Sequence, residues 1–143
     1  MHKANFDKEG NGSRLEIRVR FCETDLMGIV HHGNYLAYCE AGRVEWLRRR
    51  GVTYAAWAAQ GTHLPVVEAQ LRYRAPARFD DVIEVETRLA ELRSVSLRYD
   101  YRITRGATLL AEGYTRLACV DDKHSLRRFS AEMIETLTAR EKA

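Results

Sequence analysis

The stretch FCETDLMGIVHHGNYLAYCEAGRVEWLRRRG, from Phe21 to Gly51, joins a short acidic turn to a long predicted helix. Asp25 stands in the turn together with Gly28, and two histidines, a glycine and an asparagine follow at residues 31–34. Three arginines before Gly51 give the helix a stop signal, because cations and a following glycine favour a helix C-terminus. The stretch therefore predicts a carboxylate placed close to a helix N-terminus.

The rest of the chain predicts strands around this helix. The helix expected over residues 34–50 carries small and apolar residues on more than one side, which is typical of a helix that other elements surround. Apolar and polar residues alternate, as in half-buried strands, over four segments, and a fifth long strand is expected over 109–120. The alternating segments are 14–21, 64–73, 83–89 and 95–104. We expect an α+β fold: an antiparallel sheet of about five to six strands wrapped around a long central helix.

Length and composition are those of one globular domain. The 143 residues suffice for a single core, so we expect one domain over 1–143, with its core over about 14–138 and residues 1–13 flexible. Short helices are expected over 52–60 and, behind a serine cap, over 130–140. No apolar run reaches the length of a membrane span and the amino end is polar, so we expect a cytoplasmic protein without membrane insertion.

The charges are mostly guanidinium groups. The net charge is +3, with 19 arginines and four lysines. They could form a solvated basic surface, or some of them could hold a phosphate-bearing ligand, since arginine binds phosphate through two hydrogen bonds. A charge this small argues against a nucleic acid partner.

The three cysteines predict neither a disulfide framework nor a metal site, because they show no CxxC spacing. We expect free thiols and no metal. Cys22 lies three residues before Asp25, and a buried apolar cysteine is the simpler interpretation than a nucleophile.

Asp25 permits two interpretations. It could cap the turn or the helix, since an aspartate accepts hydrogen bonds from free backbone N–H groups. Alternatively, it could attack a substrate carbonyl or activate water against it. In that case the free N–H groups at the helix start, near His32, would stabilise the oxyanion, and Gly33 would let a carbonyl approach the backbone. The functional interpretation predicts acyl transfer to water.

Two neighbouring side chains, those of His32 and Glu40, also permit two interpretations each. His32 could position water or protonate a leaving group, or it could simply bond near the helix start. His31 is expected to point elsewhere and is not a catalytic candidate. Glu40 can form an ion pair with Arg43, three residues later on the helix, or act as a second catalytic carboxylate.

The segment resembles the hotdog-fold thioesterases, in particular the 4-hydroxybenzoyl-CoA thioesterase-like family and its branch associated with the Tol-Pal system. The resemblance extends over about residues 14–138 and rests mainly on one motif. Its matching positions here are Phe21, Thr24-Asp25, Gly28-Ile29-Val30, Gly33-Asn34-Tyr35 and Glu40-Ala41-Gly42-Arg43-Val44-Glu45.

This resemblance implies a hotdog fold and an acyl-CoA thioesterase that works as a dimer or a dimer of dimers with sites at the subunit interface. Asp25 corresponds to the catalytic aspartate, a nucleophile or a general base depending on the member, and the backbone N–H at His32 to the donor that polarises the thioester carbonyl. Gly33 is included with them as a catalytic position. Phe21 departs from the branch, where a tyrosine often stands.

The expected substrate-binding residues are Asn34 and Tyr35, from the same motif, and Arg93, which falls near a position where the family holds CoA. Arg127 and Arg128 are lesser candidates. No metal or redox cofactor is required, since a thioester is already an activated acyl group. Three alternatives stay open: a thioesterase acting on acyl carrier protein, a hotdog hydratase or dehydratase, and a non-enzymatic module that binds acyl-CoA.

Overall fold

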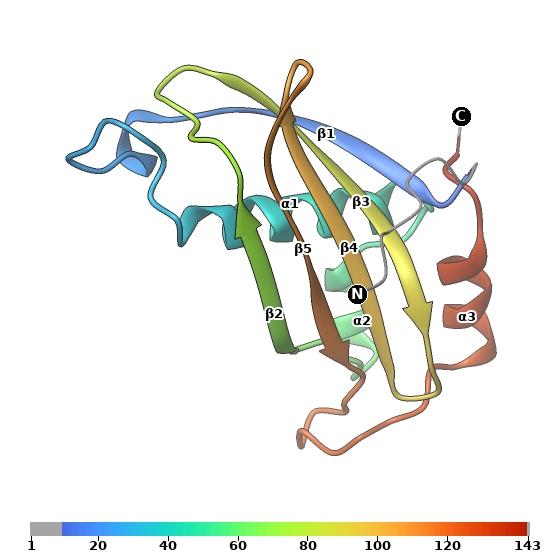
Figure 1. Cartoon of the computed structure of the whole chain (residues 1–143). Helices are drawn as coiled ribbons and strands as arrows, with labels where there is room; N and C mark the ends of the chain where they lie inside the picture. Colours follow the sequence, from blue (N-terminus) through green and yellow to red (C-terminus); the bar gives the residue numbers. More distant parts are fainter. Residues whose placement is uncertain (1–9, 143) are drawn as a thin grey trace.

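The computed structural model describes residues 10–142, which form one five-stranded antiparallel sheet with helices beside it (Figure 1). The sheet order is β1-β3-β4-β5-β2. The elements in chain order are β1 (Gly12–Arg18), the 3₁₀ helix η1 (Phe21–Glu23), α1 (Asn34–Arg48), α2 (Tyr54–Ala59), β2 (Val66–Tyr73), β3 (Val82–Leu92), β4 (Ser96–Arg105), β5 (Thr108–Ala118) and α3 (Ala131–Thr138). β1 begins two residues before the expected core, and residues 1–9 of the segment expected to be flexible lie outside the described residues.

The strands β3, β4 and β5 form the centre of the sheet as the alternating pattern predicts. On β4, the side chains of Leu97, Tyr99, Tyr101 and Ile103 are all buried, as the period of two predicts, and Asp100 on the alternate face is buried as well. Short turns join the three strands, and each is antiparallel to the next. The expected α+β architecture is confirmed.

Helix α1 packs across one face of this sheet, over β1 and β3 (Figure 1). Its buried side includes Cys39, Gly42 and Trp46, and the Trp46 ring meets Tyr99 of β4 edge to face, with ring centroids 5.2 Å apart. Leu36 on the opposite side is exposed. Within one protomer the sheet therefore covers only one side of a helix whose sequence is apolar on more than one side. No helix within residues 10–142 is long and apolar enough to cross a membrane.

Two predicted strand faces differ from the structure. The first strand ends at Arg18 instead of Phe21, because the Glu23 carboxylate accepts a 2.7 Å hydrogen bond from the Arg20 backbone N–H and turns the chain into η1. As a result Phe21 is 76% exposed instead of lying on a buried face.

The second difference concerns β2. Its apolar residues were expected to face the core, but the strand lies at the edge of the sheet and is exposed along nearly its whole length. The helix α1 makes its main sheet contacts with β1 and β3, at the other side of the sheet, and on β2, within the described chain, only Leu71 packs against the core and Tyr73 against the start of α1. The strand therefore presents apolar side chains such as Val67 to its surroundings.

Gly42 sets how closely α1 approaches the sheet, and its replacement tests this packing. A Cβ atom at position 42 would lie 2.5 Å from Thr87 Oγ1 and 2.8 Å from Val85 Cγ1. Alanine improves helix propensity by about 1 kcal/mol, but such overpacking costs about 1–3 kcal/mol. We expect Gly42→Ala to lower the free energy of unfolding in urea denaturation. Gly12→Ala is the control, because its Cβ would meet only the Thr87 carbonyl at an ordinary 3.7 Å; equal stability of the two variants would contradict the close approach.

Candidate active site

The loop between β1 and α1 holds Asp25 in a closed turn. An isolated β-bridge joins Thr24 to Val30, and the Asp25 N–H donates to the Ile29 carbonyl at 2.9 Å. The Gly28 N–H donates back to the Asp25 carbonyl at 3.0 Å, and Gly28 has a φ of 76°, a conformation that favours glycine. The ends of the loop are thus fixed to each other, with Asp25 inside the turn.

The carboxylate of Asp25 combines a structural contact with a free oxygen. Its Oδ1 accepts a 2.8 Å hydrogen bond from the Met27 N–H, which is the turn-capping role that one interpretation of the sequence gave it. Its Oδ2 accepts no hydrogen bond from any described residue. One oxygen can therefore hold the turn while the other faces a substrate.

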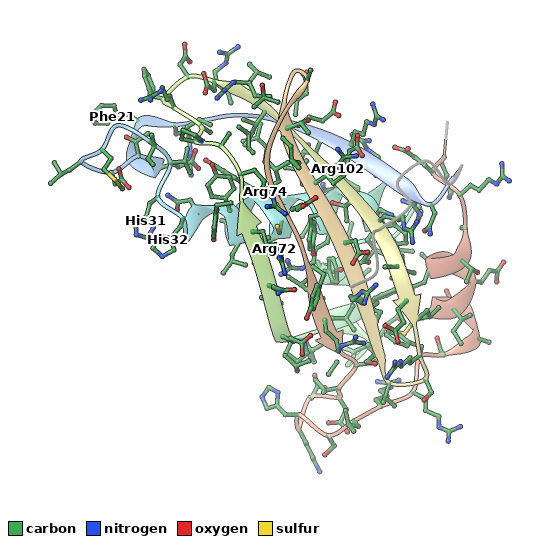
Figure 2. The ribbon with its side chains drawn as sticks, viewed as in Figure 1. Phe21, His31, His32, Arg72, Arg74 and Arg102 are labelled. Atoms are coloured by element: carbon green, nitrogen blue, oxygen red, sulfur yellow. The ribbon has the colours of Figure 1, made fainter. Side chains whose placement is uncertain are left out.

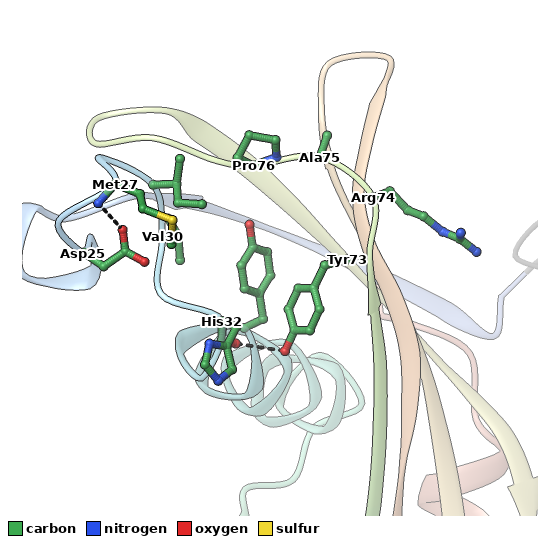
Figure 3. A pocket seen from close by; sticks show the side chains of 10 residues that line it. Asp25, Met27, Val30, His32, Tyr73, Arg74, Ala75 and Pro76 are labelled. Carbon is green, nitrogen blue, oxygen red and sulfur yellow. Dashed lines mark hydrogen bonds between the residues drawn. The ribbon is translucent and has the colours of Figure 1, made fainter.

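A pocket of about 330 Å³ opens beside this carboxylate (Figure 3). It lies between the loop, the start of α1 and the segment that follows β2. Its lining is largely apolar and aromatic, with Asp25 and His32 as the polar groups on the loop side. The lining residues are Asp25, Met27, Ile29, Val30, His32, Tyr35, Tyr73, Arg74, Ala75 and Pro76.

The backbone at the start of α1 leaves one donor available. The Gly33 N–H donates to His31 Nδ1 at 3.1 Å, and the N–H groups of Asn34 and Tyr35 donate to the carbonyls of His31 and His32. The His32 N–H has no acceptor among residues 10–142. The His32 amide is therefore free to serve as the expected oxyanion donor, whereas the amide of Gly33, also expected as a catalytic position, is already engaged.

The two histidines lie side by side, which corrects the expectation that His31 points elsewhere. Their ring centroids are 4.2 Å apart with an interplanar angle of 30°, because the His31 ring turns back over the helix start to accept from Gly33. The His32 ring is exposed and meets Tyr73 edge to face at 6.3 Å, and the Tyr73 hydroxyl donates to the His32 carbonyl at 3.0 Å. Tyr73 thus fixes the peptide that follows the free amide.

Asn34 and Tyr35 differ in their access to the pocket. The Asn34 Nδ2 donates to the Glu23 carbonyl at 2.7 Å, so this amide binds the loop to the helix, and Asn34 does not line the pocket. Tyr35 does line it and is 3% exposed, with its ring edge to face with Tyr73 at 5.3 Å. Burial raises the pKa of Tyr35, so its hydroxyl keeps its proton at neutral pH.

Arg93, Arg127 and Arg128 lie away from this pocket within one protomer. The loop that carries Asp25 follows Arg18, which pairs with Val82 at the beginning of β3, whereas Arg93 follows the last residue of β3. The Arg93 guanidinium forms an ion pair with Glu91. Arg127 donates to the carbonyls of Gln60 and Gly61 after α2, and Arg128 is an exposed neighbour. The structure does not bring these three arginines together with Asp25.

Many other arginines belong to the outer face of the sheet, where carboxylates lie opposite them. In the strand register, Glu112 stands between Arg72 and Arg102, and its carboxylate also forms a 3.0 Å ion pair with Arg74 (Figure 2). Arg74 lines the pocket, but its guanidinium points away from the other lining side chains (Figure 3). These arginines fit the interpretation of a solvated surface of mixed charge.

Cys22 and Glu40 are both exposed. Cys22 was expected to be buried, but it belongs to η1, which lies outside the core; Cys39 and Cys119 are the buried thiols, and burial raises the pKa of Cys39 to about 12. Glu40 lies 3.7 Å from Arg43 and does not line the pocket, which agrees with its ion-pair interpretation. Within residues 10–142, no group of three or more acidic, histidine or cysteine side chains is placed to hold a metal ion.

Two contributions to the site were missed by the sequence interpretation. Tyr73 and the segment up to Pro76 form the wall opposite the loop, although 41 residues separate Tyr73 from His32. Glu23 is 9% exposed and joins the loop to α1. The only sequence signal was for Tyr73, which continues the apolar face of β2 to its last residue.

The strand order and the long helix packed across the sheet define a hotdog fold. A family model described as the thioesterase-like superfamily matches residues 19–139, and the chain belongs to this superfamily. The expected class of enzyme, a thioester hydrolase, is confirmed at the level of this family. The Tol-Pal-associated branch stays a prediction.

Individual relatives agree with this family. The chain is 36% identical over 109 residues to the acyl-CoA thioester hydrolase YbgC of Escherichia coli, covering 76% of this chain and 81% of that one. It is 33% identical over 120 residues to a putative esterase of Aquifex aeolicus, covering 84% and 93%. Among solved structures, a hypothetical protein from Thermus thermophilus has a TM-score of 0.85 at 46% identity, covering 89% and 95%. A DHNA-CoA thioesterase from Staphylococcus aureus has a TM-score of 0.84 at 28% identity, covering 87% of each chain.

Gly28 allows a test of the turn that holds Asp25. A Cβ at position 28 would have room, 3.8 Å from Arg78 Nη1, so Gly28→Ala acts through its positive φ, at a cost of about 1–2 kcal/mol. Gly106→Ala is the matched control, because Gly106 has a φ of 57°, open space around it and a place in the distant β4–β5 turn. We expect both variants to lose similar stability in thermal denaturation, but only Gly28→Ala to lose thiol release from acyl-CoA. Equal activities would contradict a role for this turn.

Proposed function

We propose that this chain hydrolyses acyl-CoA thioesters to a free acid and CoA. The observation that carries the proposal is that the Asp25 carboxylate and the start of α1, with the free amide of His32, border one pocket. A carboxylate can attack the carbonyl carbon or remove a proton from water, and a backbone N–H can stabilise the oxyanion that forms. The names of YbgC and of the DHNA-CoA thioesterase support CoA esters as the substrate class.

Two routes lead to the same products. In the first, an Asp25 oxygen attacks the thioester carbon, the C–S bond breaks, CoA leaves as a thiol after protonation, and water hydrolyses the resulting anhydride. In the second, Asp25 takes a proton from a water molecule whose oxygen attacks the same carbon, and the C–S bond then breaks to release the free acid and, after protonation, CoA as a thiol. In both routes the oxyanion accepts a hydrogen bond from the His32 amide. The exposed His32 ring is a candidate to protonate the departing sulfur.

The pocket favours an acyl group as its occupant. Tyr35, Tyr73, Val30 and Pro76 present aromatic and apolar surfaces beside the carboxylate. Such a lining excludes water from a bound acyl chain and strengthens the electrostatic interactions at the carbonyl. We therefore place the acyl part in this pocket and the CoA part outside it. Hydrolysis of an acyl group on carrier protein would use the same pocket, and activity on that substrate but not on CoA esters would identify it.

We also propose that two copies of the chain associate through β2. One edge of β2 pairs with β5, and the other edge meets no described strand. Its apolar side chains are exposed, and an uncovered apolar edge strand readily pairs with another chain. The exposed side of α1, which includes Leu36, would be covered in the same association. The end of β2 lines the pocket, so the partner would lie next to the site. The expected cytoplasmic location suits such an enzyme.

The catalytic assignment of Asp25 is tested by thiol release from short, long and aromatic acyl-CoA esters. Asp25→Asn keeps the size of the side chain and an oxygen for the Met27 N–H, but it removes the nucleophile or base. We expect kcat to fall by about 100-fold or more. Glu40→Gln is the control, because this carboxylate is exposed and lies outside the pocket, and it should retain wild-type activity. Full activity of Asp25→Asn would refute the assignment.

The products separate this proposal from two other functions. A hydratase or dehydratase would release no thiol and would form an enoyl or hydroxyacyl thioester. A binding module would retain acyl-CoA without turnover. Formation of free acid and CoA in equal amounts is the result that the proposal requires.

The β2 association is tested by the molar mass in solution. The Arg74 N–H donates to the Leu110 carbonyl of β5, and because N–H groups alternate along a strand, the N–H of Ala69 points to the open edge. Ala69→Pro therefore removes a donor from that edge without removing one from the β2–β5 ladder. We expect light scattering to show a multiple of 16.5 kDa for the wild type and for Ala69→Ser, and 16.5 kDa for Ala69→Pro. A folded Ala69→Pro variant with the wild-type mass would contradict this interface.

A further inference from the structure

Glu23 places a nearly buried carboxylate between the active-site loop and helix α1. Its Oε1 accepts hydrogen bonds from the Arg20 N–H at 2.7 Å and from the Tyr38 hydroxyl at 3.1 Å, and its Oε2 lies 3.3 Å from the Arg20 guanidinium. A buried carboxylate without such donors would be strongly unfavourable. The side chain of Glu23 therefore connects η1, where the loop begins, to the second turn of the helix.

The backbone of the same residue makes a second connection. The Glu23 carbonyl accepts from the His31 N–H at 2.9 Å and from the Asn34 side chain at 2.7 Å. These two donors lie on either side of His32 and Gly33, at the start of α1. The side chain and the carbonyl of Glu23 thus bind the helix at Tyr38 and at Asn34, which lie one turn apart.

Asp25 follows Glu23 by two residues, and His32 follows His31 directly. The Asp25 carboxylate and the His32 amide are therefore both close in sequence to these contacts. The β-bridge between Thr24 and Val30 closes the turn that carries Asp25. Glu23 directly precedes this bridge, and through it the closed turn contacts the helix. We propose that Glu23 is a positioning residue, which holds the Asp25 carboxylate at a fixed separation from the His32 amide. This inference rests on the proposed thioester hydrolysis and deepens it.

Tyr38 is suited to act as the permanent donor in this arrangement. Burial and the neighbouring Glu23 carboxylate both raise the pKa of the Tyr38 hydroxyl well above its usual value. The hydroxyl therefore keeps its proton throughout the neutral range and donates to Glu23. Its ring also packs edge to face on Tyr35, whose own ring lines the pocket, with centroids 5.6 Å apart.

The test compares three variants by their steady-state thiol release. Glu23→Ala removes the side-chain contacts to Arg20 and Tyr38, and we expect kcat to fall by about 10- to 100-fold, the order of loss that a displaced reacting group produces. KM should change by no more than about threefold, since Glu23 does not line the pocket. Glu23→Gln keeps an oxygen in the place of Oε1 and should restore activity to within about threefold of wild type.

Tyr38→Phe removes the hydroxyl and keeps the ring. It should lower kcat in the same direction as Glu23→Ala and by a smaller factor, and it decides the question if Glu23→Ala does not fold. Glu45→Ala is the matched control: Glu45 forms two ion pairs on the same helix, with Arg48 and Arg49, near the end remote from the site. It should leave both kcat and KM unchanged.

Hydrogen exchange of the backbone amides separates positioning from loss of the fold. In Glu23→Ala we expect faster exchange over residues 21–34, because the loop is held less firmly and the hydrogen bond from the His31 N–H to the carbonyl of residue 23 opens more often. Exchange over β4 and β5 should be unchanged. Wild-type kcat in Glu23→Ala, or faster exchange throughout the sheet, would overturn the positioning role. A wild type that releases no thiol would instead refute the proposed function, so the two failures are distinguishable.

Discussion

The backbone carbonyl of Glu23 closes the loop between β1 and α1 onto the helix start, and the geometry of the site depends on this contact. Two donors converge on it, one from the backbone of His31 and one from the side chain of Asn34. Because this carbonyl binds the start of the helix, the residues between Glu23 and His31 form a short closed turn, and Asp25 lies in it. The carboxylate is thereby fixed beside the helix start, and in the proposed hydrolysis the free amide of His32 would need no reorganisation when negative charge develops on a substrate.

The packing of α1 explains why the helix start can be so firmly placed. Gly42 lets the helix lie directly on Thr87 and Val85 of β3, and Trp46 fills the space beneath it against Tyr99. Bulky buried residues on β4 support it from the sheet. The opposite side of the helix and most of β2 remain exposed in one protomer, although both carry apolar residues. In the proposed association, a second copy of the chain would bury these surfaces and lie beside the pocket.

The helices and strands could be predicted well from the sequence because burial of one face imposes a regular spacing on their apolar residues. The alternation on β4 and the stop signal after α1 each correspond to an element within a few residues of its expected bounds. That Asp25 and His32 lie close together could also be expected, since both belong to one continuous segment, and both line the pocket; their catalytic roles stay predictions. The prediction for Phe21 was wrong because a side-chain contact from Glu23, and not hydrophobic periodicity, decides where β1 ends.

The remaining errors concern contacts between residues far apart in sequence or within irregular turns. Tyr73 reaches His32 across 41 residues, and no local pattern reports that the end of an edge strand forms a pocket wall. The stacking of His31 on His32 follows from the Nδ1 contact to Gly33, which depends on the exact path of the backbone. The role of Arg93 in binding CoA stays a prediction, since the length of β3 separates this residue from Asp25 within one protomer and the expected site lies at a subunit interface.

The most direct measurement is a crystal structure with an acyl-CoA analogue in which a methylene group replaces the thioester sulfur, because this ketone keeps the carbonyl and cannot be hydrolysed. The account predicts that the ketone oxygen lies about 3 Å from the His32 backbone nitrogen, with an Asp25 carboxylate oxygen facing the carbonyl carbon. A ketone bound away from the start of α1, or an Asp25 carboxylate turned from it, would contradict the account.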